Sequence, residues 1–362
     1  MNNRDLFIYA QTKKSKRTLS ETKSTLKSLI DRSITSIDEF QLHEITEIGV
    51  RAFSDCKNLL YANIPDSVTA IGVGAFYNCE NLNVTIEDGL TVGENAFYGC
   101  SNVSMVTDTK PSYELDANEK FYGCDNITII IPSGTTVVAE EAFKGCDVIT
   151  ELITPSTVTE IRTKAFMDCV HLKKATITLN ETINEFSIQV GAFSQCYELE
   201  EIELPSNLKK LNAYTFLKNT NLTNINIPNA VTKMETGVFS ECSSLTGITL
   251  PNRLEYMRNR VFERCTNLAT INIPSSLTQV DSTTFLACSS LETVTLESGF
   301  NANGLDLSVS TLYSVNTLVT MLNALANRTG QVPYTLTLGS TNLAKLSNEQ
   351  LAIATEKNWT LA

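Results

Sequence analysis

The sequence has few residues suited to imidazole chemistry and no long apolar run. Only two of its 362 residues are His and one is Trp. This leaves almost nothing for imidazole-based catalysis or for a His-rich metal site. No stretch approaches the roughly 20 apolar residues that a membrane-spanning helix needs. No apolar run follows the basic residues near the N-terminus either, so we expect neither membrane insertion nor a signal peptide.

Charge is unevenly distributed along the chain. The formal net charge is −12, yet residues 1–33 carry eight basic and three acidic side chains. The remainder carries 20 basic and 37 acidic residues. An acidic body repels phosphate, so we do not expect nucleic acid as a partner. The basic N-terminal segment is interpreted either as a solvated helix or tail, or as an arm that contacts something anionic.

A repeat organises most of the chain. Eleven Phe residues recur at intervals of 21 to 27 residues, and in ten of these units a Cys follows three positions later. Those are all ten cysteines, and Asn219 takes the position in the remaining unit. The repeating aromatic residues are Phe53, Phe76, Phe97, Phe121, Phe143, Phe166, Phe193, Phe216, Phe239, Phe262 and Phe285.

The rest of each unit predicts one short strand. An aliphatic residue stands three positions after the Cys, and a stretch such as Ile202-Glu203-Leu204-Pro205 follows. Alternating apolar residues indicate a strand, and Pro ends it because Pro cannot donate to the ladder. Apolar residues at spacing three then favour a helical or 3₁₀ turn. Since one turn cannot bury its own apolar face, the pattern predicts a right-handed parallel α/β solenoid of about eleven turns of ~23 residues.

The unit A-F-x-x-C-x-x-L-x-x-I-x-I-P-x-x-V-x-x-I-G resembles the leucine-rich repeat of the BspA-like class. That class occurs in bacterial surface proteins and in phage and prophage proteins. The resemblance covers about residues 34–300 and implies a leucine-rich-repeat fold. We therefore expect three regions: a basic arm or cap helix at 1–33, the solenoid at 34–300, and an α/β cap at 301–362.

The cap is predicted from its own patterns. Leu318, Met321, Leu322 and Leu325 have helical spacing, and we expect that helix to end near Gly330. The alternation over residues 334–339 predicts a strand. A capping-box pair at positions 347 and 350 predicts a second helix that continues to about residue 357, and residues 359–361 are predicted to form a short strand.

The cysteines admit three interpretations. No two lie closer than 21 residues, which disfavours zinc sites built from C-x-x-C pairs. Disulfide frameworks usually join irregularly spaced cysteines in small secreted domains. One Cys at the same place in every turn favours a ladder of reduced, buried thiols that pack as small hydrophobic groups.

The outward residues of the predicted strands are the candidate ligand-binding residues. Many are Thr or Asn, which can hydrogen-bond to a glycan or to a protein backbone. The same composition also follows from the preference of Thr for strands, so both interpretations stay open. The candidates are Tyr61, Asn63, Ile130, Ile153, Thr176, Glu203, Asn226, Thr249, Asn272 and Thr295.

The N-terminal segment is a second candidate. It either caps the open end of the solenoid or docks the protein onto a larger assembly. The residues proposed for docking are Phe7, Tyr9, Lys13, Lys14, Lys16 and Arg17.

The sequence contains no phosphate-binding glycine loop, dinucleotide fingerprint or calcium loop. We therefore expect no enzyme, no cofactor and no metal. The favoured function is recognition or adhesion, with a protein or glycan of a host surface as the partner. The favoured setting is a phage virion, which reaches the extracellular surface after lysis; otherwise the protein is expected to be cytoplasmic. The alternatives are a structural scaffold that assembles through its N-terminal arm and an intracellular protein-interaction module.

Overall fold

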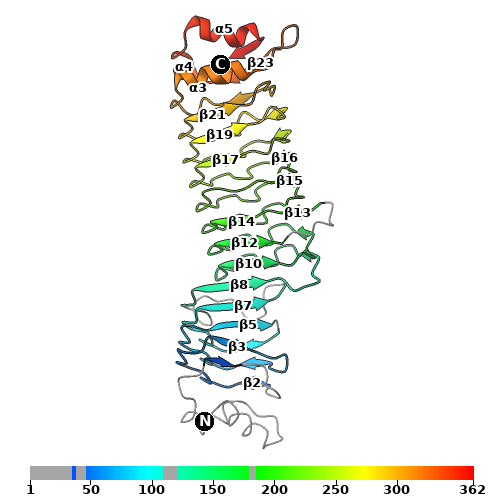
Figure 1. Cartoon of the computed structure of the whole chain (residues 1–362), viewed down its shortest axis with the longest axis vertical. Coiled ribbons are helices and arrows are strands. Elements are labelled where there is room, and N and C mark those ends of the chain that lie inside the picture. Colours follow the sequence, from blue (N-terminus) through cyan, green and yellow to red (C-terminus); the bar gives the residue numbers. More distant parts are fainter. Residues whose placement is uncertain (1–34, 38–45, 88, 109–120, 122, 179–184) are drawn as a thin grey trace, which may run out of the picture. The chain divides into compact units, whose positions relative to one another are not determined.

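The computed structural model describes residues 35–37, 46–87, 89–108, 121, 123–178 and 185–362 (Figure 1). The chain divides into two compact units. The first unit contains residues 1–132 and 146–153, and the second contains residues 133–145 and 154–362. The predicted arm at 1–33 lies outside the described residues. The fold is a parallel β-solenoid of about 13 turns of ~23 residues. This exceeds the expected eleven because turns also form before Phe53 and after Phe285.

In the first unit, two rows of parallel strands run along the stack of turns. The longer strands form one row, seen in blue and cyan in Figure 1, and two-residue strands form the other. The first row contains β1 (Ser36–Ile37), β3 (Tyr61–Asn63), β5 (Asn83–Glu87), β7 (Asn102–Val106), β8 (Asn126–Ile130) and β10 (Glu151–Thr154). The second row contains β2 (Glu47–Ile48), β4 (Ala70–Ile71) and β6 (Thr91–Val92).

The second unit repeats this arrangement. Its first row contains β12 (Lys174–Ile177), β14 (Glu201–Glu203), β17 (Gly247–Thr249), β19 (Thr270–Ile273) and β21 (Thr293–Leu296). Its second row contains β9 (Val137–Val138), β11 (Glu160–Ile161), β13 (Ser187–Ile188), β15 (Lys210–Leu211), β16 (Lys233–Met234), β18 (Tyr256–Met257) and β20 (Gln279–Val280).

The second row corrects the prediction of one strand and one helical or 3₁₀ turn per repeat. The segment around each Phe is a chain of turns, with left-handed residues two positions before and after the ring in most repeats. Around Phe53 these are Arg51 (φ 53°) and Asp55 (φ 61°). A helix needs consecutive right-handed residues, so this alternation excludes one. Backbone hydrogen bonds instead join this segment to the next turn. For example, Phe53 N donates to Ala75 O at 2.6 Å.

Two ladders of buried side chains fill the core. The Phe rings stack from turn to turn, with centroids 5.2 Å apart for Phe53 and Phe76 and 5.1 Å apart for Phe143 and Phe166. Each such pair contributes about 0.5–1.5 kcal/mol beyond the burial of its area. All ten cysteines are free; nine are buried and Cys124 is half-buried. The prediction of a reduced, buried thiol ladder is confirmed.

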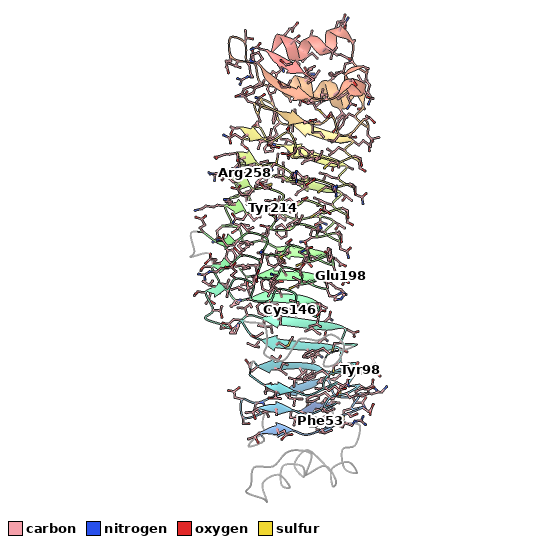
Figure 2. All side chains as sticks on the ribbon, turned by 180° about the vertical axis from the view of Figure 1, so that it is seen from behind. Phe53, Tyr98, Cys146, Glu198, Tyr214 and Arg258 are labelled. Atoms are coloured by element: carbon pink, nitrogen blue, oxygen red, sulfur yellow. The ribbon has the colours of Figure 1, made fainter. Side chains whose placement is uncertain are left out.

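The thiols also hydrogen-bond between turns. Cys79 Sγ donates to the carbonyl oxygen of Phe53 at 3.0 Å, and Cys242 Sγ donates to that of Phe216 at 3.1 Å. Burial raises the pKa of both thiols to about 12. Figure 2 labels Phe53 and Cys146 on the ribbon that carries these ladders.

The cap ends the second unit. It contains β22 (Leu305–Asp306), α3 (Val315–Ala324), β23 (Tyr334–Thr337), α4 (Ser340–Leu343), α5 (Asn348–Glu356) and β24 (Trp359–Leu361). Helix α3 packs on β21, so its buried residues close the core of the last turn (Figure 1). The capping box of Ser347 and Gln350 is present as predicted.

Two details of the cap differ from the prediction. Helix α3 ends at Ala324 rather than near Gly330, because Leu325 takes an extended ψ of 137°. The segment that follows is held by Arg328, whose guanidinium lies 3.3 Å over the ring of Tyr334 and donates to Val332 O. The short helix α4 was not predicted.

Candidate functional site

The first row of strands in the first unit carries a hollow of about 420 Å³, which we call the first hollow. It lies on the outward side of β1, β3, β5 and β7. Its lining is Ser36, Ile37, Tyr61, Ala62, Asn63, Asn83, Val84, Thr85, Asn102 and Ser104.

The second unit carries a comparable hollow of about 440 Å³, which we call the second hollow. It lies on β17, β19 and β21 and on the segment that precedes β17 by one turn. Its lining is Asn224, Ile225, Gly247, Ile248, Thr249, Thr270, Ile271, Asn272, Thr293 and Thr295.

Both hollows are uncharged and are built on ordered strands. In each strand the apolar residues point into the core, so amides and hydroxyls face outward. In β21, for example, Val294 and Leu296 are buried while Thr293 and Thr295 are exposed. The register places Thr249, Asn272 and Thr295 opposite one another on three neighbouring strands. Such an array can hydrogen-bond to a neutral polar surface, and its lining has no charged side chain to form an ion pair.

Half of the predicted binding residues line these hollows. Tyr61 and Asn63 belong to the first hollow, and Thr249, Asn272 and Thr295 belong to the second. Thr176 and Glu203 face each other on β12 and β14 but line neither hollow. The predicted docking residues at positions 7–17 lie outside the described part of the chain.

Ile130 and Ile153 occupy a different column from Asn63. Asn63 pairs with Thr85, and the same column continues through Ser104 and Thr128 to Glu151. Ile130 and Ile153 pair with each other, two residues further along the strands. The prediction missed this because ten residues separate Phe53 from Asn63, whereas seven separate Phe121 from Thr128.

Asn226 does not lie on a strand. The predicted strand over residues 225–227 keeps the buried positions of Ile225 and Ile227, but no ladder includes it. Asn is depleted in strands, and Asn224 and Asn226 both face outward here. In the next turn, Gly247 stands one repeat after Asn224, and Gly weakens a strand.

Nine outward lining residues lie outside the set of candidate binding residues: Ser36, Asn83, Thr85, Asn102, Ser104, Asn224, Gly247, Thr270 and Thr293. Asn83 and Asn102 begin β5 and β7, and each stands just before a buried Val. That alternation is visible in the sequence. The shorter third repeat hid it, because only 19 residues separate Asn83 from its partner Asn102.

No group of three or more His, Cys, Asp and Glu residues could hold a metal ion in the described part of the chain. His171 Nδ1 lies 2.9 Å from Glu198 Oε1 at an exposed edge. Figure 2 labels Glu198 on one side of the second unit and Tyr214 and Arg258 on the other.

The repeat signature, the stacked turns and the Phe and Cys ladders define a leucine-rich-repeat protein. The family model for the BspA type leucine rich repeat region (6 copies) matches residues 31–118, 116–217 and 210–307. The chain belongs to this family, which is typically non-enzymatic. No curated protein matches the sequence.

The chain is similar, at low identity, to solved bacterial leucine-rich-repeat structures. A leucine rich cell surface protein of Faecalibacterium prausnitzii is 22% identical, with 79% of this chain and 87% of that chain covered and a TM-score of 0.33. A leucine-rich repeat protein of Eubacterium ventriosum is 22% identical, with 76% and 84% covered and a TM-score of 0.40. One of Bacteroides ovatus is 21% identical, with 88% and 87% covered and a TM-score of 0.35.

Among the described residues, no helix is both long and apolar enough to cross a membrane.

Proposed function

We propose that this protein is a non-enzymatic recognition protein that binds its partner through the outward side of its first row of strands. The observation that carries this proposal is the pair of uncharged hollows on that row, one in each unit. Most of their polar side chains are held on parallel strands that pair with neighbouring strands, which lowers the entropy cost of binding.

The second hollow supports the proposal directly. Thr249, Asn272, Thr270 and Thr293 present hydroxyls and an amide in register, with hydrogen-bonding capacity directed away from the core. Thr and Asn lose little side-chain entropy on binding compared with Lys or Glu. The surface therefore suits a neutral polar face of a protein or glycan.

A matched pair of variants tests this assignment. Asn272→Lys places a charge in the middle of the second hollow, whereas Gln279→Lys places the same charge in the same turn on the second row. Purified full-length protein is measured against cell envelopes by sedimentation. We expect Asn272→Lys to weaken envelope binding at least tenfold and Gln279→Lys to leave it within twofold. Equal binding by both variants would remove the strand row as the recognition surface.

Treatment of the envelopes separates the two partner classes. Protease removes a protein partner, and periodate cleaves the vicinal diols of a glycan partner. Loss of binding after one treatment assigns the class.

The phage-virion setting expected from the family resemblance has no observation behind it and stays a prediction. Detection of the protein in purified virions by mass spectrometry tests this prediction.

Assembly through the N-terminal arm also stays a prediction. It is tested by comparing the assembly of the full-length protein with that of a truncated protein containing residues 34–362.

A further inference from the structure

The first hollow differs from the second in having one aromatic ring. Tyr61 is the first residue of β3 in the first unit and is 61% exposed, the largest exposed fraction of any aromatic side chain in the described residues. Its neighbours in the same column are Ser36 on β1 and Asn83 on β5. A large ring left in water beside polar groups indicates a contact surface.

Amides next to this ring are held in place. Asn102 Nδ2 donates to Asn83 Oδ1 at 2.6 Å, and Asn126 Nδ2 donates to Asn102 Oδ1 at 2.9 Å. Asn83 Nδ2 in turn donates to the carbonyl oxygen of Leu60 at 3.2 Å. Each amide has two donors and two acceptor lone pairs, so this ladder uses only part of its capacity. The remaining capacity is oriented before any ligand arrives.

A second column of small polar groups runs beside the first. Asn63, Thr85 and Ser104 face outward in register on β3, β5 and β7. Among the described residues, their side chains make no hydrogen bond to one another or to the Asn ladder. The hollow therefore combines one exposed aromatic ring, that of Tyr61, with two columns of uncharged hydrogen-bonding side chains.

This combination matches a neutral sugar. A pyranose has an apolar face of C–H groups that packs on the negative face of an aromatic ring, and its rim of hydroxyls both donates and accepts. Four neighbouring strands span about 14 Å at the usual strand spacing, which suits a short oligosaccharide. The volume of about 420 Å³ lies in the usual range for ligand sites.

Other ligand classes fit less well. No charged side chain lines the hollow, so an anionic glycan or a phosphate finds no cationic group to pair with. β3 is hydrogen-bonded to β1 and β5, and β5 to β3 and β7, so neither of these two strands offers an open edge to an added peptide strand.

We propose that the first hollow binds a neutral oligosaccharide, with Tyr61 stacking on one sugar ring and Asn63, Thr85 and Ser104 binding its hydroxyls. This proposal rests on the proposed function, because it names the ligand class of one of the two recognition hollows.

Binding of defined sugars to the full chain tests it. Neutral hexasaccharides of glucose, mannose and galactose, with sialylated and sulfated counterparts, are measured by titration calorimetry. We expect at least one neutral probe to bind and the charged counterparts to bind at least tenfold more weakly. Tyr61→Ala and Tyr61→Leu should each lose at least tenfold, whereas Tyr61→Phe should stay within threefold because it keeps the ring. Saturation-transfer spectra should be strongest for protons on one face of one sugar.

The control variant is Tyr197→Ala, which removes a 38% exposed ring that lines neither hollow and should leave sugar affinity unchanged. Equal sugar affinity of Tyr61→Ala and the unchanged protein would overturn the proposal. So would an absence of binding to every neutral probe in protein that still sediments with envelopes, and in that case the proposed function stands. If the unchanged protein binds neither the sugars nor the envelopes, this proposal and the proposed function are both overturned.

Discussion

The two hollows lie on the same kind of scaffold but present different chemistry. In the first hollow one outward column contains Tyr61, Asn83 and Asn102, whereas one outward column of the second hollow contains Gly247, Thr270 and Thr293. The residues beneath them are alike, since buried aliphatic side chains alternate with the outward ones in both. The comparison shows that the core of each turn is held constant while the outward positions vary independently.

The largest predicted effect concerns the buried thiols of the Cys ladder, and both units should show it because both contain this ladder. Burial raises the pKa of Cys79 and Cys124 in the first unit, and of Cys242 and Cys288 in the second, from 9.0 to about 12. An unfolded thiol loses its proton near pH 9, whereas a buried one keeps it. Stability is therefore fully present below pH 9 and is lost as pH rises toward 12, by about 1.4 kcal/mol per pH unit for each thiol.

Guanidinium unfolding at pH 8 to 11 under reducing conditions measures this loss. Far-UV circular dichroism reports both units, and the fluorescence of Trp359, the one Trp, reports the second. We expect both signals to show unfolding at progressively lower denaturant. Cys79→Ala should make the pH dependence shallower in circular dichroism and leave the Trp359 signal unchanged. A midpoint that stays constant to pH 11 would contradict a buried thiol ladder.

The next prediction concerns the turn in the second unit where Asn219 takes the place of the Cys in the thiol ladder. Asn219 is fully buried in the second unit, and its Oδ1 accepts from Cys196 N at 3.1 Å. Its Nδ2 has no hydrogen-bond partner within the described residues. Asn219→Cys removes this buried donor and restores the thiol of the other turns. We expect a gain of about 1 kcal/mol in the free energy of unfolding, seen in Trp359 fluorescence.

The reverse substitution is the control. Cys265→Asn introduces the same amide at a fully buried site two turns away, where Sγ now donates to Phe239 O at 3.1 Å. It should destabilise the second unit by about 1–3 kcal/mol. A loss of stability in Asn219→Cys would show that the bond to Cys196 N outweighs the unpaired donor.

Most of the fold could be predicted from the sequence because the repeat is dictated by burial. A Phe, a Cys and an aliphatic residue at constant spacing identify the core of most turns, and Pro205 or Pro274 marks where a strand stops. The second row of strands was missed because two residues, such as Glu160 and Ile161, carry no measurable alternation. Gly74 and Asn78 signalled the left-handed positions around Phe76, but Lys164 and Asp168 at the same places did not.

The candidate site was harder to predict because it depends on register between turns. Alternation within one strand identified the outward residues, including Thr249 and Asn272. It did not show which outward residues stand side by side, since that depends on loop length. Ile130 stands two residues beyond Thr128 along β8, and Thr128 is the residue that lies in the column of Asn63. The hollows also depend on small residues, and Gly247 contributes to the second hollow because it has no side chain.

Gly247 allows the smallest and most local test of the comparison. A Cβ there would lie 2.9 Å from Thr270 Oγ1, the rotatable end of a side chain, so the hydroxyl must turn away. Gly247→Ala should change the free energy of unfolding by less than about 0.5 kcal/mol, because the gain in strand propensity offsets this contact. Envelope binding should weaken several-fold as the methyl group fills the second hollow, while sugar binding at Tyr61 stays unchanged. If the substitution lowers sugar affinity as well, the two hollows do not act independently, and their different columns serve one ligand.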